Sequence, residues 1–171
     1  MQDRVLVVAR AVVRFANWAN WAIAGGMVVA LLLSFVFGDA LAAHLALKYP
    51  GGNLAATMSL LRVMAGLAIV ASFAVHQIFT RLLAIIATVR AGDPFVAANA
   101  GRLQRIGWAL LAIQLLDLVL GAVNLALDRI GVEHATWTPA LGGWIAVLMI
   151  FVLARVFRVG AAMRDDLAMT V

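Results

Sequence analysis

The chain has 171 residues, of which 65% are hydrophobic and 12% are charged, and it carries a formal net charge of +5. This composition, together with a mean hydropathy of +1.05, excludes a soluble globular domain. The sequence contains no cysteine, which excludes disulfides, thiol chemistry and cysteine-ligated zinc. Because a hydrocarbon core about 30 Å thick requires about 20 apolar residues per helix, the chain has room for four spans in a single membrane domain.

Four apolar segments alternate with arginine-bearing segments, which predicts an all-α membrane protein with four transmembrane helices and short loops. The predicted spans cover residues 18–38, 56–83, 106–127 and 138–158. We expect the first apolar segment to remain part of the mature protein instead of acting as a cleaved secretory signal. Its apolar region is longer than the usual h-region of about 7–15 residues, and three further spans follow it.

Positive charge falls mainly on every second connection. The side of the N-terminal segment, the middle connection and the tail has Arg4, Arg10, Arg14, Arg81, Arg90, Arg102, Arg105, Arg155, Arg158 and Arg164, whereas the opposite side has Lys48, Arg62 and Arg129. Since Lys and Arg are enriched in cytoplasmic loops, this asymmetry predicts that both termini lie in the cytoplasm. It also accounts for the net charge, so we expect no direct binding to nucleic acid.

The connection between the second and third spans is predicted to form a well-ordered turn between two helices, which we call the corner. Gly92 is expected to end the second helix in a left-handed conformation, Asp93 to cap a new helix, and Pro94 to occupy its first position. Arg102 and Arg105 are then expected to reach lipid phosphates or the cytoplasm. The residues expected to face the membrane or the helix bundle are Phe95, Leu103 and Ile106.

The tail, residues 156–171, is expected to continue the fourth helix beyond the membrane. Its charged side chains are Arg158, Arg164, Asp165 and Asp166. They are consistent with a solvated helix end. A docking surface for a cytoplasmic partner is the alternative, because a carboxylate pair stands beside the apolar Leu167 and Met169.

The corner and the tail carry the motifs by which the chain resembles a known family. The corner has Gly92-Asp93-Pro94-Phe95, Asn99, Arg102-Leu103 and Ile106-Gly107-Trp108, and the tail has Val156-Phe157-Arg158, Gly160, Arg164, Asp165 and Thr170-Val171. This pattern resembles the bacterial integral membrane family catalogued as domain of unknown function 2975. The chain departs from it at Val159, where a second basic residue is common. The resemblance implies a location in the bacterial inner membrane and a gene often found beside a small helix-turn-helix transcription regulator.

We therefore expect a non-enzymatic regulatory membrane protein that binds this regulator through its cytoplasmic loop and tail. The candidate partner-binding residues are Asp93, Pro94, Phe95, Asn99, Arg102, Arg105, Arg158, Arg164, Asp165 and Asp166. No catalytic constellation or cofactor motif is recognisable, and His44, His76 and His134 are too scattered to form a metal site. The other expected contacts are with membrane lipids and, in a homo-oligomer, with further copies of the chain.

The alternative is a small-molecule or proton-linked sensor or transporter that uses polar groups inside the membrane, where they are costly and often functional. The candidates are Arg62, His76, Gln77, Gln114 and Asp117. At 1.5 Å per residue, Arg62 and Asp117 lie about 12 Å and about 15 Å below the outer ends of their helices. They are therefore able to pair. In the structural interpretation they form an ion pair, while Gln114 and His76 hydrogen-bond between helices.

Overall fold

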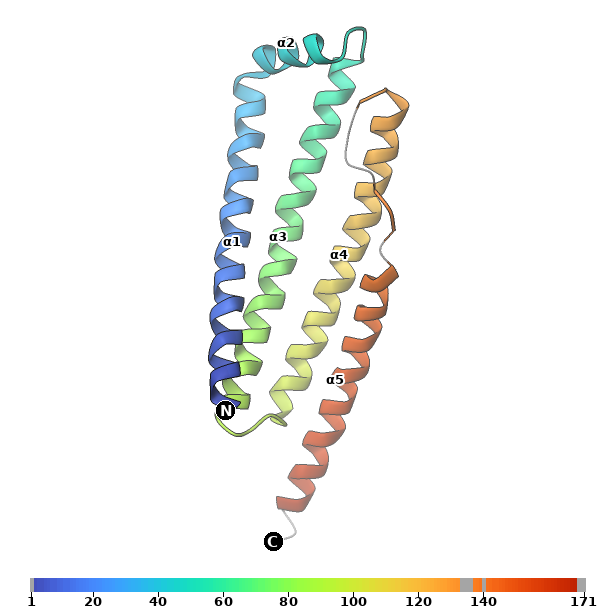
Figure 1. The fold of residues 1–171 in the computed structure, drawn as a ribbon. Helices are drawn as coiled ribbons and strands as arrows, with labels where there is room; N and C mark the ends of the chain where they lie inside the picture. Colours follow the sequence, from blue (N-terminus) through green and yellow to red (C-terminus); the bar gives the residue numbers. More distant parts are fainter. Residues whose placement is uncertain (1, 133–136, 140, 169–171) are drawn as a thin grey trace. The chain divides into compact units, whose positions relative to one another are not determined.

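The computed structural model describes residues 2–132, 137–139 and 141–168, and it describes their side chains except at residues 2, 3, 165, 167 and 168. The described residues form helices and no strand: α1 (Gln2–Val36), α2 (Gly38–Lys48), α3 (Leu54–Arg90), α4 (Ala97–Arg129) and α5 (Leu141–Ala168) (Figure 1). The predicted all-α class is confirmed. The side chain of Asp165 and the motif residues 170–171 lie outside the described part of the chain.

Within the described residues, four helices are long and apolar enough to cross a membrane: α1, α3, α4 and α5. The predicted number of spans is confirmed. The helices are longer than the predicted spans, however, and the 37 residues of α3 would extend about 55 Å. The prediction ended each span near its charged residues, but Arg and Lys are good helix formers, so the helices continue through them.

Two connections differ from the prediction. Residues 39–48 were expected to belong to a loop. Residues 38–48 form α2, in which Asp39 lies in the first turn and Lys48 in the last. These charges complement the helix dipole, and the intervening alanines and leucines favour a helix. The fourth helix begins at Leu141 instead of near residue 138, because Pro139 disfavours helical geometry at the residue that precedes it.

The chain divides into two compact units, and α1, α3 and α4 contribute residues to both. The first unit comprises Met1–Asn20, Phe73–Gln114 and Ala140–Val171, and the second comprises Trp21–Ser72 and Leu115–Pro139.

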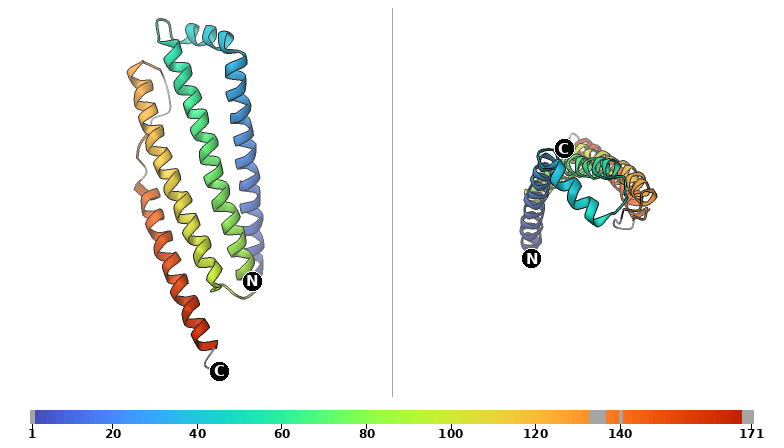
Figure 2. Two further views of the ribbon diagram at one scale, coloured as in Figure 1. Left: turned by 180° about the vertical axis from the view of Figure 1, so that it is seen from behind. Right: turned by 90° about the horizontal axis from the view of Figure 1, so that it is seen from above.

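In the first unit, α5 lies along the initial half of α4 (Figures 1 and 2). Phe151 of α5 packs edge-on against Trp108, with ring centroids 5.3 Å apart. It also covers Gly107, where a Cβ atom would lie only 3.0 Å from the ring. Leu103 and Ile106, which were expected to face the membrane or the helix bundle, are both buried in the bundle. The absence of a side chain at Gly107 thus lets the two helices approach closely.

In the second unit, the core forms around the end of α4. Leu127 is almost fully buried and clusters with Val123 and Val132. Gly131, just beyond the end of α4, has a φ of +70°, and the amide of Val132 donates to the Leu127 carbonyl at 3.1 Å. This is a Schellman motif with its usual hydrophobic contact. Residues of α3 and the α2–α3 connection, among them Leu60, Met64, Leu67 and Tyr49, pack against this cluster.

Candidate functional site

The corner between α3 and α4 is built partly as predicted. Gly92 has a φ of +81°, and its amide and that of Asp93 donate to the carbonyls of Val89 and Thr88. This Schellman motif confirms that Gly92 ends α3. The prediction that Asp93 caps the next helix and Pro94 starts it is wrong, because α4 begins at Ala97.

Asn99 holds this corner from inside. Its side chain is completely buried, and its Nδ2 donates to the Thr88 hydroxyl at 2.7 Å and to the Pro94 carbonyl at 2.8 Å. Its Oδ1 accepts a 2.7 Å hydrogen bond from Arg102. One amide therefore joins the last turn of α3, the connection and the first turn of α4, and its polar atoms are paired as burial requires.

This arrangement corrects two predicted partner contacts. Asn99 has no exposed surface and cannot touch a partner. Arg102 was expected to reach lipid phosphates or the cytoplasm, but its Nη1 turns inward to Asn99 and lies 3.4 Å from the Ala84 carbonyl. A guanidinium with a buried acceptor nearby gains a charge-assisted hydrogen bond there. Both residues therefore shape the corner instead of binding at its surface.

The distal part of α5 packs against the corner through what we call the corner–tail contact, formed by Asp93, Phe95, Phe157, Gly160 and Arg164. Arg164 makes an ion pair with Asp93. The rings of Phe95 and Phe157 lie 5.2 Å apart, and a Cβ atom at Gly160 would lie 3.1 Å from Phe95. The two segments singled out in the sequence thus meet in space, which the sequence did not reveal.

Beside this contact lies a hollow of about 440 Å³ between α4 and α5, here called the α4–α5 hollow. It is lined by Ala97, Ala100, Gly101, Arg158, Ala161 and Ala162. Its walls are small residues, and its one charged lining residue, Arg158, donates to Gln104 at 2.9 Å. A Cβ atom added at Gly101 would meet no neighbour within 4 Å, so the hollow has room for a side chain from another molecule.

Several predicted residues remain at the surface of the first unit. Arg105, Arg158 and Asp166 are exposed, and Arg164 retains 53% of its side-chain exposure despite its ion pair. The apolar Val159 and Met163 are also exposed on α5. The surface around the corner–tail contact therefore combines charge with apolar area, as protein-binding surfaces do.

A family profile described as a protein of unknown function, DUF2975, matches residues 39–171. The chain belongs to this family. The match contains the corner, the tail, all of α3, α4 and α5, and α2 except its first residue. Searches of the curated proteins and of the solved structures find no match to the chain.

In the second unit of this DUF2975 protein, Arg62 binds the end of α1. Its Nη2 donates to the Ser34 carbonyl at 2.5 Å and its Nε to the Ser34 hydroxyl at 3.1 Å. Its guanidinium lies 4.0 Å from the centre of the Phe35 ring. A cation at a helix C-terminus satisfies unpaired carbonyls and complements the dipole. The interpretation of an Arg62–Asp117 ion pair is therefore not supported, since Arg62 has these partners instead.

Asp117 accepts a hydrogen bond from Trp137 of the same unit. The indole Nε1 lies 3.2 Å from Oδ1 of the carboxylate, and the ring covers Gly121, one turn further along α4. A Cβ atom at Gly121 would lie 2.7 Å from that ring. Trp137 folds onto α4 because Gly121 leaves space for its ring and Asp117 offers an acceptor to its indole N–H.

The other predicted polar residues belong to the first unit. Nδ1 of His76 lies 2.9 Å from Oδ1 of Asn17, and Gln77 accepts from Arg81 one turn along α3 at 3.2 Å. Gln114 packs its amide over Gly143, and its Nε2 is buried with no hydrogen-bond partner. Asn17, Ser34 and Trp137 are the hydrogen-bond partners of these polar side chains that sequence reasoning missed. Asn17 and Ser34 were visible as polar residues in or next to an uncharged span.

Within the described residues, no three His, Cys, Asp or Glu side chains gather closely enough to hold a metal ion.

Proposed function

We propose that this protein is a non-enzymatic regulatory component of the bacterial inner membrane, with both termini in the cytoplasm, that binds a small helix-turn-helix transcription regulator. The orientation rests on the arginine asymmetry, and the class of partner rests on the family resemblance. The corner–tail contact and the α4–α5 hollow form the binding surface.

The observation that carries this proposal is the contact between the two motif-bearing segments. Asp93 and Arg164 are 71 residues apart in the chain, yet they form an ion pair, and Phe95 packs on Phe157. A half-exposed ion pair of this kind stabilises a fold by only about 0–1 kcal/mol. The ion pair therefore contributes little to stability, and its half-exposed groups form one surface with the exposed apolar side chains around them.

The α4–α5 hollow supplies the second feature of a binding surface. Binding energy at interfaces is concentrated in a few side chains that fill well-packed pockets. The hollow offers alanine and glycine walls to an apolar side chain, and Arg158 at its edge offers hydrogen-bond donors. Exposed Val159 and Met163 extend the apolar surface on α5. This surface suits an amphipathic helix with one apolar anchor and acidic neighbours.

We prefer this function to a proton-linked sensor or transporter. That alternative uses Arg62, His76 and Asp117, and each of them has a neighbouring polar partner: Ser34, Asn17 and Trp137 respectively. Arg62 in particular binds a helix end, which is a structural role. No pair of facing titratable groups emerges from these contacts.

The test uses the purified protein in nanodiscs and a purified helix-turn-helix regulator from the same gene neighbourhood. Gly101→Trp places a large side chain into the hollow, where a Cβ atom meets no neighbour. We expect it to reduce regulator binding by at least about tenfold, as for loss of one interface anchor. Gly142→Trp is the matched control, because Gly142 also has open space around it but lies at the opposite end of α5.

Charge reversal supplies a second variant. Arg164→Asp places two carboxylates side by side at the corner, and we expect it to weaken regulator binding while the helical signal of the protein is retained. If wild-type protein fails to bind the regulator, or if Gly101→Trp binds as tightly as Gly142→Trp, the proposal is wrong.

A further inference from the structure

A second hollow in the first unit lies between α3 and α4 and has a volume of about 400 Å³. We call it the α3–α4 groove. Its lining residues are Phe73, Ala74, Gln77, Arg105, Trp108 and Ala109. None of them contributes to the corner–tail contact or to the α4–α5 hollow. The groove is therefore a separate feature of the molecule.

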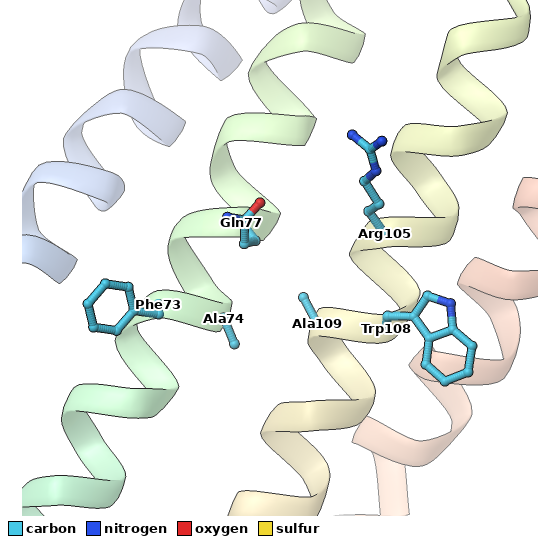
Figure 3. Close-up of a pocket in the computed structure, with 6 residues that line it drawn as sticks. All are labelled: Phe73, Ala74, Gln77, Arg105, Trp108 and Ala109. Atoms are coloured by element: carbon cyan, nitrogen blue, oxygen red, sulfur yellow. The ribbon is translucent and has the colours of Figure 1, made fainter.

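The groove is polar at one end and apolar at the other. Figure 3 shows Gln77 and Arg105 together toward one end, with Ala74 and Ala109 facing each other further along. The polar end is nearer the corner, because Gln77 follows Ala74 on α3 and Arg105 precedes Ala109 on α4. Arg81 adds a second cation at this end by donating to Gln77 at 3.2 Å.

Both cations retain unused donors. Arg105 is exposed and makes no hydrogen bond or ion pair with any residue that the structure describes. Nε of Arg81 is buried without a hydrogen-bond partner. A guanidinium presents a planar fork of donors that matches the oxygens of a phosphate group. The polar end thus has the chemistry to hold one phosphate between α3 and α4.

We propose that the α3–α4 groove binds an anionic phospholipid, with the phosphate on Arg105 and the start of one acyl chain over Ala74 and Ala109. Both helices are candidate membrane spans, so the groove lies between two helices that are able to contact lipid. Trp108 and Phe73 are exposed at its sides, and tryptophan is enriched at the level of lipid headgroups. A volume of about 400 Å³ is at the small end for ligand pockets, which fits a headgroup and part of a chain.

The lipid proposal concerns a different pair of helices and a different ligand from the regulator proposal, although Arg105 was also predicted to contact the regulator. It is tested by native mass spectrometry of the full chain in detergent, with phosphatidylglycerol as the anionic probe and phosphatidylcholine as the zwitterionic one. We expect wild-type protein to retain phosphatidylglycerol in preference. Arg105→Gln should reduce that retention by about fivefold, as expected for one basic residue near an anionic lipid.

Arg90→Gln is the matched control, since Arg90 is an exposed arginine at the end of α3 that does not line the groove. It should leave retention unchanged. Ala74→Leu keeps every charge but fills the apolar end, and it should lower retention as well. Equal retention of the two lipids, or an equal loss for Arg90→Gln and Arg105→Gln, would overturn the proposal. So would displacement of phosphatidylglycerol by inorganic phosphate, since that result would identify a phosphate site without a chain.

Discussion

The amide of Asn99, in the first turn of α4, donates a 2.7 Å hydrogen bond to the hydroxyl of Thr88, in the last turn of α3. Thr88 in turn donates to the Ile85 carbonyl at 2.8 Å. The corner is consequently held by a continuous chain of hydrogen bonds between two helices. A partner that binds at this end meets a preorganised surface, which lowers the entropic cost of association.

Replacement of Asn99 by leucine should destabilise the protein by about 3 kcal/mol, because three hydrogen bonds are lost and buried polar groups are left unpaired. The measurement is reversible unfolding in mixed micelles, followed by circular dichroism. Arg90→Ala changes an exposed side chain at the end of α3, close to the corner. It should shift the midpoint of the unfolding transition little. Equal stabilities of the two variants would show that Asn99 does not support the corner.

The partners of Arg62 can be separated by double-mutant cycles. We expect a coupling energy of about 1 kcal/mol between Arg62→Gln and Ser34→Ala, since these side chains share a hydrogen bond. The cycle between Arg62→Gln and Asp117→Asn should give less than about 0.5 kcal/mol, as for residues without a shared interaction. A larger coupling with Asp117 than with Ser34 would restore the ion-pair interpretation.

Substitution of Gly121 by alanine should displace the indole of Trp137, because the new Cβ atom would lie 2.7 Å from the ring. The hydrogen bond to Asp117 is then lost, and the cost is about 1–3 kcal/mol. Fluorescence of a variant that keeps only Trp137 among its tryptophans should report the change. Gly142→Ala is the control, as it meets no neighbour and should preserve both emission and stability. An unshifted emission in Gly121→Ala would contradict the contact.

The absence of cysteine makes each introduced cysteine a unique reporter of orientation. Leu47, on α2, and Met163, near the end of α5, are 82% and 62% exposed and tolerate replacement for that reason. A membrane-impermeant maleimide should label Leu47→Cys in intact spheroplasts and Met163→Cys only after the membrane is opened. The reverse pattern would place both termini outside and remove the regulator proposal.

The sequence predicted those features that depend on local chemistry. The four spans were predicted from long apolar segments. Gly92 was predicted to end a helix because glycine readily adopts the left-handed conformation found after a last helical turn. The burial of Asn99 was not predictable, since it depends on Thr88 and Pro94 being folded over it. Trp137 and Asp117 are 20 residues apart, and only the turn at the end of α4 brings them together. α2 was missed because the prediction assigned helices only to segments long enough to cross a membrane, and α2 has 11 residues.

The corner–tail contact also has a consequence for biogenesis. Asp93 and Phe95 emerge from the ribosome well before Phe157 and Arg164, so the surface that they form together cannot exist until α5 has been synthesised and inserted. A binding protein that requires both the corner and the distal part of α5 would not bind chains whose synthesis stops early or that insert only three helices. Recognition of this surface would thereby distinguish finished molecules from nascent ones.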